Sequence, residues 1–258
     1  MKKNVFKIIA LLILCVLIIS AAACGSQQQS RPETPSGEGE QTPEGHSAIP
    51  WKDAAKNALD ANPGLLLKFE LSSSRGVLIY GIDILGSDNK VIEADINALT
   101  GGIVRTERKN KTEKDAEVLR SAVLTHEDAV NAALKEVPGS AIRSSELETE
   151  LGKPVFETEV TDEKGIMHSV VIDARSGEIL SKTQNVSADR LSSVKISRDE
   201  AASKAQTAAG GGTIAENILE FDDGKLKYEV TVITENGTAY EAEIDAVSGD
   251  ILRQQTAD

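Results

Sequence analysis

Few residues in this chain have the types and spacing that catalysis requires. The sequence contains three histidines, His46, His126 and His168, and none of them stands at the spacing of a metal site or a catalytic triad. The glycines at 210–212 follow a predicted helix, whereas a phosphate-binding loop would precede a helix. We therefore expect no catalytic residue, no metal site and no cofactor.

Each histidine also has a structural interpretation. His168 lies in the inward phase of a predicted strand, so we expect it to be packed in the core and hydrogen-bonded. His126 lies in the first turn of a predicted helix and is expected to face solvent. His46 lies in a polar segment, where a solvated loop residue is expected. A hydrolase that uses His168 is the alternative.

A six-residue pattern ending in glycine occurs at 96–101, 172–177 and 244–249, which indicates that one small unit is used three times. An aspartate or asparagine at a strand end can bond the backbone two residues further on, and glycine adopts the positive φ of a tight turn. Calcium binding is the alternative, but calcium takes about six or more oxygen ligands and each turn supplies at most two carboxylates. We interpret these as structural turn residues: Asn97, Gly101, Asp173, Gly177, Asp245 and Gly249.

The N-terminus has the features of an export signal. Three lysines precede an apolar run at 8–19, and small residues lead directly to Cys24. This pattern resembles a bacterial lipoprotein, with residues 1–23 as the signal peptide and Cys24 as the lipid attachment site. A membrane-spanning anchor is the alternative, but the run is shorter than the roughly 20 residues that a spanning helix needs. The expected location is the extracytoplasmic face of the bacterial cell membrane.

The formal net charge of the chain is −13, and removal of residues 1–23, which contain three lysines, would take it to −16. Such an acidic surface repels phosphate backbones and anionic lipid headgroups. We therefore expect no nucleic-acid partner, and attachment to the membrane only through the lipid on Cys24. Because Cys15 lies within the signal, no thiol remains for a disulfide or a metal site.

The rest of the chain alternates between helical and strand patterns. Residues 24–47 are rich in Gln, Ser, Pro, Gly and Glu, which predicts a disordered tether. Trp51 is expected to pack at the start of the first helix, with an exposed anchor as the alternative. In the second repeat, Thr125 and Asp128 predict a helix N-cap, and period-two strands follow the helix. We expect an α+β fold of tandem units, each with one helix packed on a three- to four-stranded antiparallel sheet.

The repeated unit resembles the PepSY domain. The resemblance rests on a helix that begins with Ile or Leu, Thr or Ser, two variable residues and an acidic residue, and on the later Ile-Asp-Ala-x-Ser-Gly turn. It is close at 124–182 and 196–254 and looser at 49–107, where Pro50, Asn97 and Gly102 depart from the pattern. The predicted segments are a divergent repeat 1 at 48–107, a charged linker at 108–122, repeat 2 at 123–183, a linker at 184–194 and repeat 3 at 195–256.

Two further expectations concern the linkers and the surface. We expect the charged segment 105–120 to extend as a helix and the three repeats to form semi-independent domains. A set of glutamates predicts an acidic strand face, which we interpret as a solvated edge that discourages aggregation, with a surface for a basic partner as the alternative. These residues are Glu146, Glu148, Glu150, Glu157 and Glu159.

The resemblance implies a noncatalytic role, because PepSY domains occur in the propeptides of thermolysin-like metalloproteases and in cell-envelope proteins. We expect a membrane-anchored binding or regulatory protein whose partner is a peptidase or another envelope protein. An extended segment added at a sheet edge is the expected binding mode, because few aromatic residues are left to line a ligand pocket. A passive envelope scaffold is the alternative function.

Overall fold

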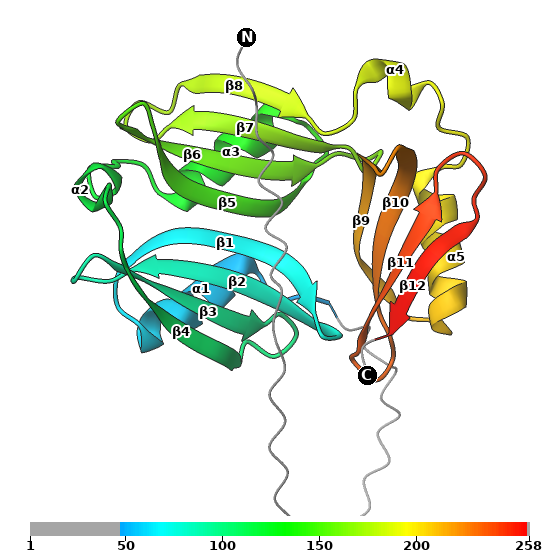
Figure 1. Cartoon of the computed structure of the whole chain (residues 1–258), viewed down its shortest axis with the longest axis horizontal. Coiled ribbons are helices and arrows are strands. Elements are labelled where there is room, and N and C mark those ends of the chain that lie inside the picture. Colours follow the sequence, from blue (N-terminus) through cyan, green and yellow to red (C-terminus); the bar gives the residue numbers. More distant parts are fainter. Residues whose placement is uncertain (1–46, 257–258) are drawn as a thin grey trace, which may run out of the picture. The chain divides into compact units, whose positions relative to one another are not determined.

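The computed structural model describes residues 47–256, and the same unit occurs three times within this range (Figure 1). Each unit has one helix followed by four antiparallel strands, so the predicted α+β fold is confirmed. The first unit contains α1 (Trp51–Ala61), β1 (Leu65–Ser74), β2 (Val77–Leu85), β3 (Lys90–Asn97) and β4 (Ile103–Thr112). The second contains α3 (His126–Glu136), β5 (Ala141–Glu150), β6 (Lys153–Thr161), β7 (Met167–Asp173) and β8 (Ile179–Gln184). The third contains α5 (Arg198–Ala209), β9 (Thr213–Asp222), β10 (Lys225–Ile233), β11 (Ala239–Asp245) and β12 (Ile251–Thr256).

The alternation of side chains decides which face of each sheet is buried. The helix of each unit packs on its sheet, and the strand residues that point toward it are mostly apolar. The predicted inward positions of the second strand of each unit are all buried, as expected. They are Tyr80, Ile82 and Ile84; Phe156, Thr158 and Val160; and Leu226, Tyr228, Val230 and Val232.

Helix starts follow the predicted capping pattern. Thr125 and Asp128 form a capping box at α3, in which each side chain bonds the backbone N–H of the other residue. The Ser197 hydroxyl accepts from the Glu200 N–H at α5, whereas Pro50 at α1 provides no side-chain cap. The three helices are short, so their stability depends on the sheets that they cover.

The first two units share one sheet of eight strands, in the order β4-β3-β2-β1-β5-β6-β7-β8. The junction is an antiparallel pairing of β1 with β5, in which Phe69 lies opposite Ser145. Each of these residues is the fifth of its strand, so the two units meet in a locally symmetric way. The expectation of semi-independent domains is therefore wrong for the first two repeats, because hydrogen bonds continue from one sheet into the other.

The charged segment 105–120 is also different from the prediction. Strand β4 continues to Thr112, and only the four residues of α2 (Ala116–Leu119) are helical. Strand β4 pairs with β3 over this segment, and exposed ion pairs lie across the two strands, such as Lys109 with Glu93 at 2.7 Å. A second four-residue helix, α4 (Ala188–Leu191), lies in the other linker.

A row of rings connects the helices of the first two units. Trp51 of α1 stacks on Phe69 of β1 with ring centroids 4.1 Å apart, so Trp51 packs as expected. Phe69 lies 5.8 Å from His126 of α3, and His126 meets Phe156 of β6 edge-on at 4.8 Å. Helices α1 and α3 therefore cover the same face of the eight-stranded sheet.

The third unit has its own four-stranded sheet and contacts both other units. The Ala239 N–H donates to the Gly76 carbonyl of the first unit at 2.7 Å, and Ile233 and Ala239 join the first unit's core. The Leu219 N–H donates to the Gly165 carbonyl of the second unit at 2.8 Å. The three units are thus joined by backbone hydrogen bonds as well as by linkers.

We predict that Phe69→Ala weakens the first two units together. Phe69 is fully buried, and removing its ring leaves a cavity below the β1–β5 junction, so the expected loss is about 3–5 kcal/mol of unfolding free energy. Urea denaturation measures the loss, and hydrogen exchange is expected to show lower protection in both β1 and β5. Val123→Ala, at a residue that is 72% exposed, is the control and should change stability by about 0.5 kcal/mol or less. Full protection of β5 in Phe69→Ala would contradict the shared sheet.

Candidate interaction surface

The three repeated turns use their polar side chains internally. In each turn one side-chain oxygen accepts two backbone N–H bonds of 2.8–2.9 Å. These bonds lower the pKa of Asp173 and Asp245, because they stabilise the ionised carboxylate. The glycine that closes each turn has φ between 74° and 78°, a conformation that suits glycine. The oxygens and glycines belong to Asn97, Asp173 and Asp245, and to Gly101, Gly177 and Gly249.

Within residues 47–256, no group of three or more His, Cys, Asp or Glu side chains is placed to hold a metal ion. The same part of the chain contains no helix long and apolar enough to cross a bilayer. Cys24, the predicted lipid attachment site, lies outside the described residues, as do the signal peptide, His46 and most of the predicted tether.

His126 is buried, and the expectation that it faces solvent is wrong. It is only 6% exposed, its Nδ1 lies 3.0 Å from the Ser145 hydroxyl, and its Nε2 lies 3.1 Å from the Leu66 carbonyl. Burial lowers its pKa to about 4, so the ring is neutral at pH 7. The pairing of β1 with β5 places this helix start over the neighbouring unit, which helical periodicity alone does not reveal. His126 therefore joins the first unit to the second.

His168 is partly buried and braces a hairpin turn. Its Nε2 lies 3.1 Å from Oδ2 of Asp162, and the other oxygen of that carboxylate accepts from the N–H groups of Lys164 and Ile166. The hydrogen bond agrees with the expectation, but the ring is only partly buried, because the alternation of buried residues along β7 begins at Val170. This arrangement fixes the turn between β6 and β7.

The predicted acidic face lies in the middle of a sheet. Strands β5 and β6 are interior strands of the eight-stranded sheet, so the expectation that these glutamates lie at a sheet edge is wrong, although Glu146 and Glu150 are exposed to solvent. Glu146 lies opposite Glu157, and Glu148 is close enough to Glu157 to share a hydrogen bond. Burial and then the charges of neighbouring glutamates raise the pKa of Glu148 to about 7.

Arg143 forms an ionic junction with carboxylates of all three units. Its Nη1 lies 3.2 Å from Glu70 of β1 and 3.2 Å from Glu159 of β6, and its Nε lies 3.4 Å from Glu216 of β9. The Ser144 hydroxyl donates to Glu159 at 2.9 Å. One guanidinium therefore faces three carboxylates. No local sequence pattern indicates this junction, because Glu70 and Glu216 lie in other repeats than Arg143.

The junction leaves Glu216 in an unfavourable electrostatic environment. Its side chain is 14% exposed, and burial raises its pKa to about 7. Arg143 opposes the rise, whereas Glu229 and Glu70 add to it. The contact of the third unit with the other two is thus less favourable in free energy when Glu216 is ionised.

The two sheets have four terminal strands, and one of them is covered. The outer edge of β9 is occupied because the Gly165 carbonyl accepts from Leu219 N–H, Asn185 Nδ2 donates to Leu219 O, and Arg198 Nε donates to Asn217 O. The other terminal strands are β4, β8 and β12, the last strand of each unit.

Each of these last strands begins with two exposed aliphatic residues. Their exposed fractions lie between 37% and 55%, which is high for large apolar side chains at the start of a strand. A free edge with aliphatic side chains is suited to pairing with another extended chain. The residues are Ile103 and Val104, Ile179 and Leu180, and Ile251 and Leu252.

Comparisons with known proteins agree with this architecture. The model of the PepSY family, described as peptidase propeptide and YPEB domain, matches residues 123–183 and 195–255. The uncharacterized protein YkoJ of Bacillus subtilis strain 168 is 31% identical over 139 residues, which cover 54% of this chain and 78% of YkoJ.

Solved structures are also similar to this chain. The CD1622 protein of Clostridium difficile 630 matches with a TM-score of 0.37 and 18% identity, over 56% of this chain and 96% of CD1622. The C-terminal domain of Bacillus megaterium YpeB matches with a TM-score of 0.25 and 16% identity, over 82% of this chain and 99% of that domain.

We predict that Glu216→Gln gains stability relative to the wild type as the pH rises. The folded-state pKa of Glu216, about 7, lies above its ordinary value of 4.5, so the folded state holds this proton more tightly. The stability that the wild type gains from holding this proton in the folded state is fully present below pH 4.5 and is lost as the pH rises through about 7. Between pH 5 and 8 the difference in unfolding free energy should move toward the glutamine variant by about 1–3 kcal/mol.

Urea denaturation at both pH values measures this difference. The effect should be larger in an Arg143→Met background, because the ionised Glu216 then lacks its cation. Glu178→Gln, which changes an exposed carboxylate, is the control. If the difference between wild type and Glu216→Gln is the same at pH 5 and pH 8, Glu216 does not titrate as described.

Proposed function

This chain belongs to the PepSY family, and on that premise we propose that it is a noncatalytic regulatory protein that binds and restrains peptidases of the cell envelope. The observation that carries the proposal is that, among the described residues, each of the three units ends in an edge strand that no other strand covers and that begins with an exposed aliphatic pair. Such an edge holds an extended polypeptide through backbone hydrogen bonds, and an extended chain is also the form in which peptidases handle their substrates.

The histidines support a noncatalytic role. His126 has both ring nitrogens engaged and is buried, and His168 is bonded to a carboxylate that fixes a turn. A passive scaffold would need the same folded units but would have no use for exposed strand edges. Exposed edges promote aggregation, so they are expected to be lost where they serve no purpose. The open edges therefore favour a binding protein.

We further propose that the protein is anchored on the extracytoplasmic face of the membrane through a lipid on Cys24. The basic residues, apolar run and small residues before Cys24 support this assignment. Two acyl chains would hold a surface whose negative charge is otherwise repelled by anionic headgroups.

The full-length lipidated chain in vesicles should slow cleavage of a reporter protein by one or more peptidases of its own envelope, a thermolysin-like metallopeptidase among them. The expected result is a rate that falls with the concentration of the chain and a peptidase that is retained on the vesicles. Heat-unfolded chain is the control for competition by a mere substrate. Unchanged cleavage of the reporter by every peptidase, together with no retained peptidase, would contradict this role and favour the scaffold.

Labelling of cells with an alkyne fatty acid tests the anchor. Wild-type chain should take up the label, and Cys24→Ala should lose it, because the thiol is the acceptor. Cys15→Ala is the matched control and should keep the label, since Cys15 lies inside the predicted signal. Retention of the label in Cys24→Ala would show that the lipid attachment site was assigned wrongly.

A further inference from the structure

In the first two units a side-chain contact joins the helix to the last strand or to the turn before it. Asn57 Nδ2 of α1 donates to the Gly101 carbonyl at 2.9 Å. Lys182 Nζ of β8 lies 2.9 Å from Glu136 Oε1 of α3. These contacts bridge the helix and the edge strand, or the turn before it, in those units.

The third unit has neither contact. By position in the repeat, Lys204 replaces Asn57, and Ala208 and Gln254 replace the ion pair of Glu136 and Lys182. The Lys204 side chain lies over Gly249, within 3.3 Å of where a Cβ would stand, but it has no hydrogen-bond or ion-pair partner within residues 47–256. Sequence divergence has removed both bridges from this unit.

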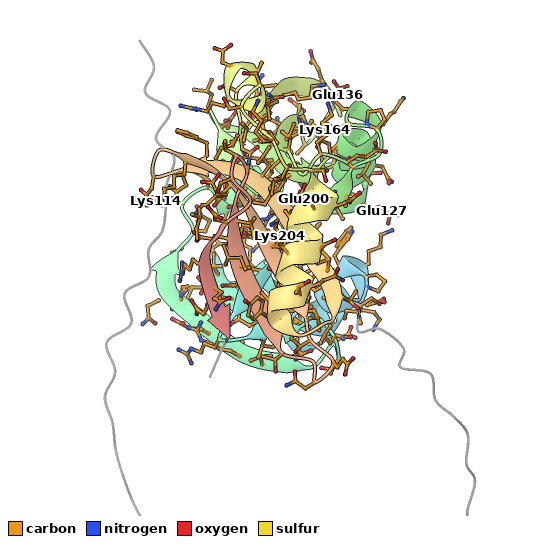
Figure 2. All side chains as sticks on the ribbon, turned by 90° about the vertical axis from the view of Figure 1, so that its right-hand side faces the viewer. Lys114, Glu127, Glu136, Lys164, Glu200 and Lys204 are labelled. Atoms are coloured by element: carbon orange, nitrogen blue, oxygen red, sulfur yellow. The ribbon has the colours of Figure 1, made fainter. Side chains whose placement is uncertain are left out.

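A groove of about 400 Å³ occupies this place, between α5 and the start of β12. Thr207, Ala208 and Ile251 give it a mainly apolar lining. Figure 2 labels Glu200 and Lys204 on the exposed side of α5, and both residues also line the groove. Their opposite charges leave the groove without net charge, so an aliphatic side chain fits it better than a charged one.

The edge of β12 beyond this groove offers backbone groups to a further strand. The Asp245 N–H donates to the Asp250 carbonyl, on the β12 side, whereas the next N–H, that of Ala246, donates to the Leu226 carbonyl of β10. Successive residues at the end of β11 therefore bond to opposite neighbours. Across β11 and β12, Glu243 faces Arg253 and Ala242 faces Gln254. Arg253 and Gln255 therefore bond to β11, and the N–H and C=O groups of Gln254 point outward, whereas the register shifts at Ile251 and Leu252.

We propose that the β12 edge and the α5 groove form the docking site for an extended segment of a partner protein with aliphatic residues at alternate positions. The segment adds as a fifth strand, and its aliphatic side chains enter the groove beside Ile251. A second copy's β12 does not fit this description, because Ile251 and Leu252 are adjacent and the following residues are polar. This site rests on the binding role proposed above, but not on the partner being a peptidase.

An octapeptide that alternates valine and threonine, with blocked termini and a fluorescent label, is the probe. Titrated into the full-length chain, it should show saturable binding by anisotropy. Gln254→Pro removes an outward N–H from the edge while leaving the bonds of its neighbours to β11, and it should weaken binding at least tenfold. Lys182→Pro, at the equivalent position of β8, is the matched control and should bind like the wild type within twofold.

A second variant closes the groove without touching the backbone. Ala208→Glu combined with Gln254→Lys transplants the ion pair of the second unit, and it should also weaken binding at least tenfold. The converse pair, Glu136→Ala with Lys182→Gln, opens the second unit and should raise the stoichiometry from one peptide toward two. A peptide with aspartate at every valine position should bind at least tenfold more weakly. Circular dichroism and thermal unfolding establish that each variant is folded.

The proposal is overturned if the wild type does not bind the peptide, if Gln254→Pro binds it unchanged, or if Lys182→Pro loses binding equally. Self-association that Gln254→Pro abolishes would assign the edge to a second copy and overturn it as well. Peptide binding without any effect on peptidases would retain this site and reject the peptidase role. Peptide binding that Gln254→Pro leaves unchanged, together with peptidase inhibition at wild-type strength, would reject this site and retain the peptidase role.

Discussion

The edges of the sheets are the constraint from which this architecture follows. Each unit has one short helix, which covers one face of four strands and leaves the first and last strands with unpaired backbone groups. The first strands solve this problem in two ways. Strands β1 and β5 pair with each other, whereas β9 is covered by a hairpin, an asparagine and an arginine from its surroundings. Within residues 47–256 no strand pairs with the outer edge of the last strand of any unit, and these edges are therefore where we propose that a partner binds.

The first residue of each helix is an equivalent position that carries a different side chain in each unit, namely Trp51, His126 and Arg198. It faces the fifth residue of the first strand in every unit, and in the second and third units it also reaches the preceding unit. His126 meets the Leu66 carbonyl of unit one, and Arg198 Nη1 donates to the Asp162 carbonyl of unit two at 3.2 Å. The pairs are Trp51 with Phe69, His126 with Ser145, and Arg198 with Asn217. A histidine at this position therefore serves the joining of units, because burial and two hydrogen bonds leave it no free nitrogen.

The parts of the fold that the sequence predicts are those governed by local periodicity. Alternation placed Tyr80, Phe156 and Tyr228 in the core, and the capping box at Thr125 appears where it was expected. Apart from the helix expected at 105–120, where β4 pairs with β3 of its own unit, the wrong predictions concern contacts between repeats. His126 was expected in solvent, because its burial depends on β1, which lies about 60 residues earlier in the chain. The Arg143 junction has the same origin, since no pattern within one repeat indicates that carboxylates of two others will surround it.

Electrostatics explains why an edge suits this protein better than a charged face. The glutamates of β5 and β6 already repel one another strongly enough, together with their burial, to raise the pKa of Glu148, so adding an acidic partner there would cost more. A basic partner would be attracted, but it would compete with Lys68, which already contacts Glu70 and Glu146. Backbone hydrogen bonds at the β12 edge require neither an acidic nor a basic partner. An extended aliphatic segment can therefore bind a chain of net charge −13 without being selected by that charge, and specificity comes from the side chains that fit beside α5.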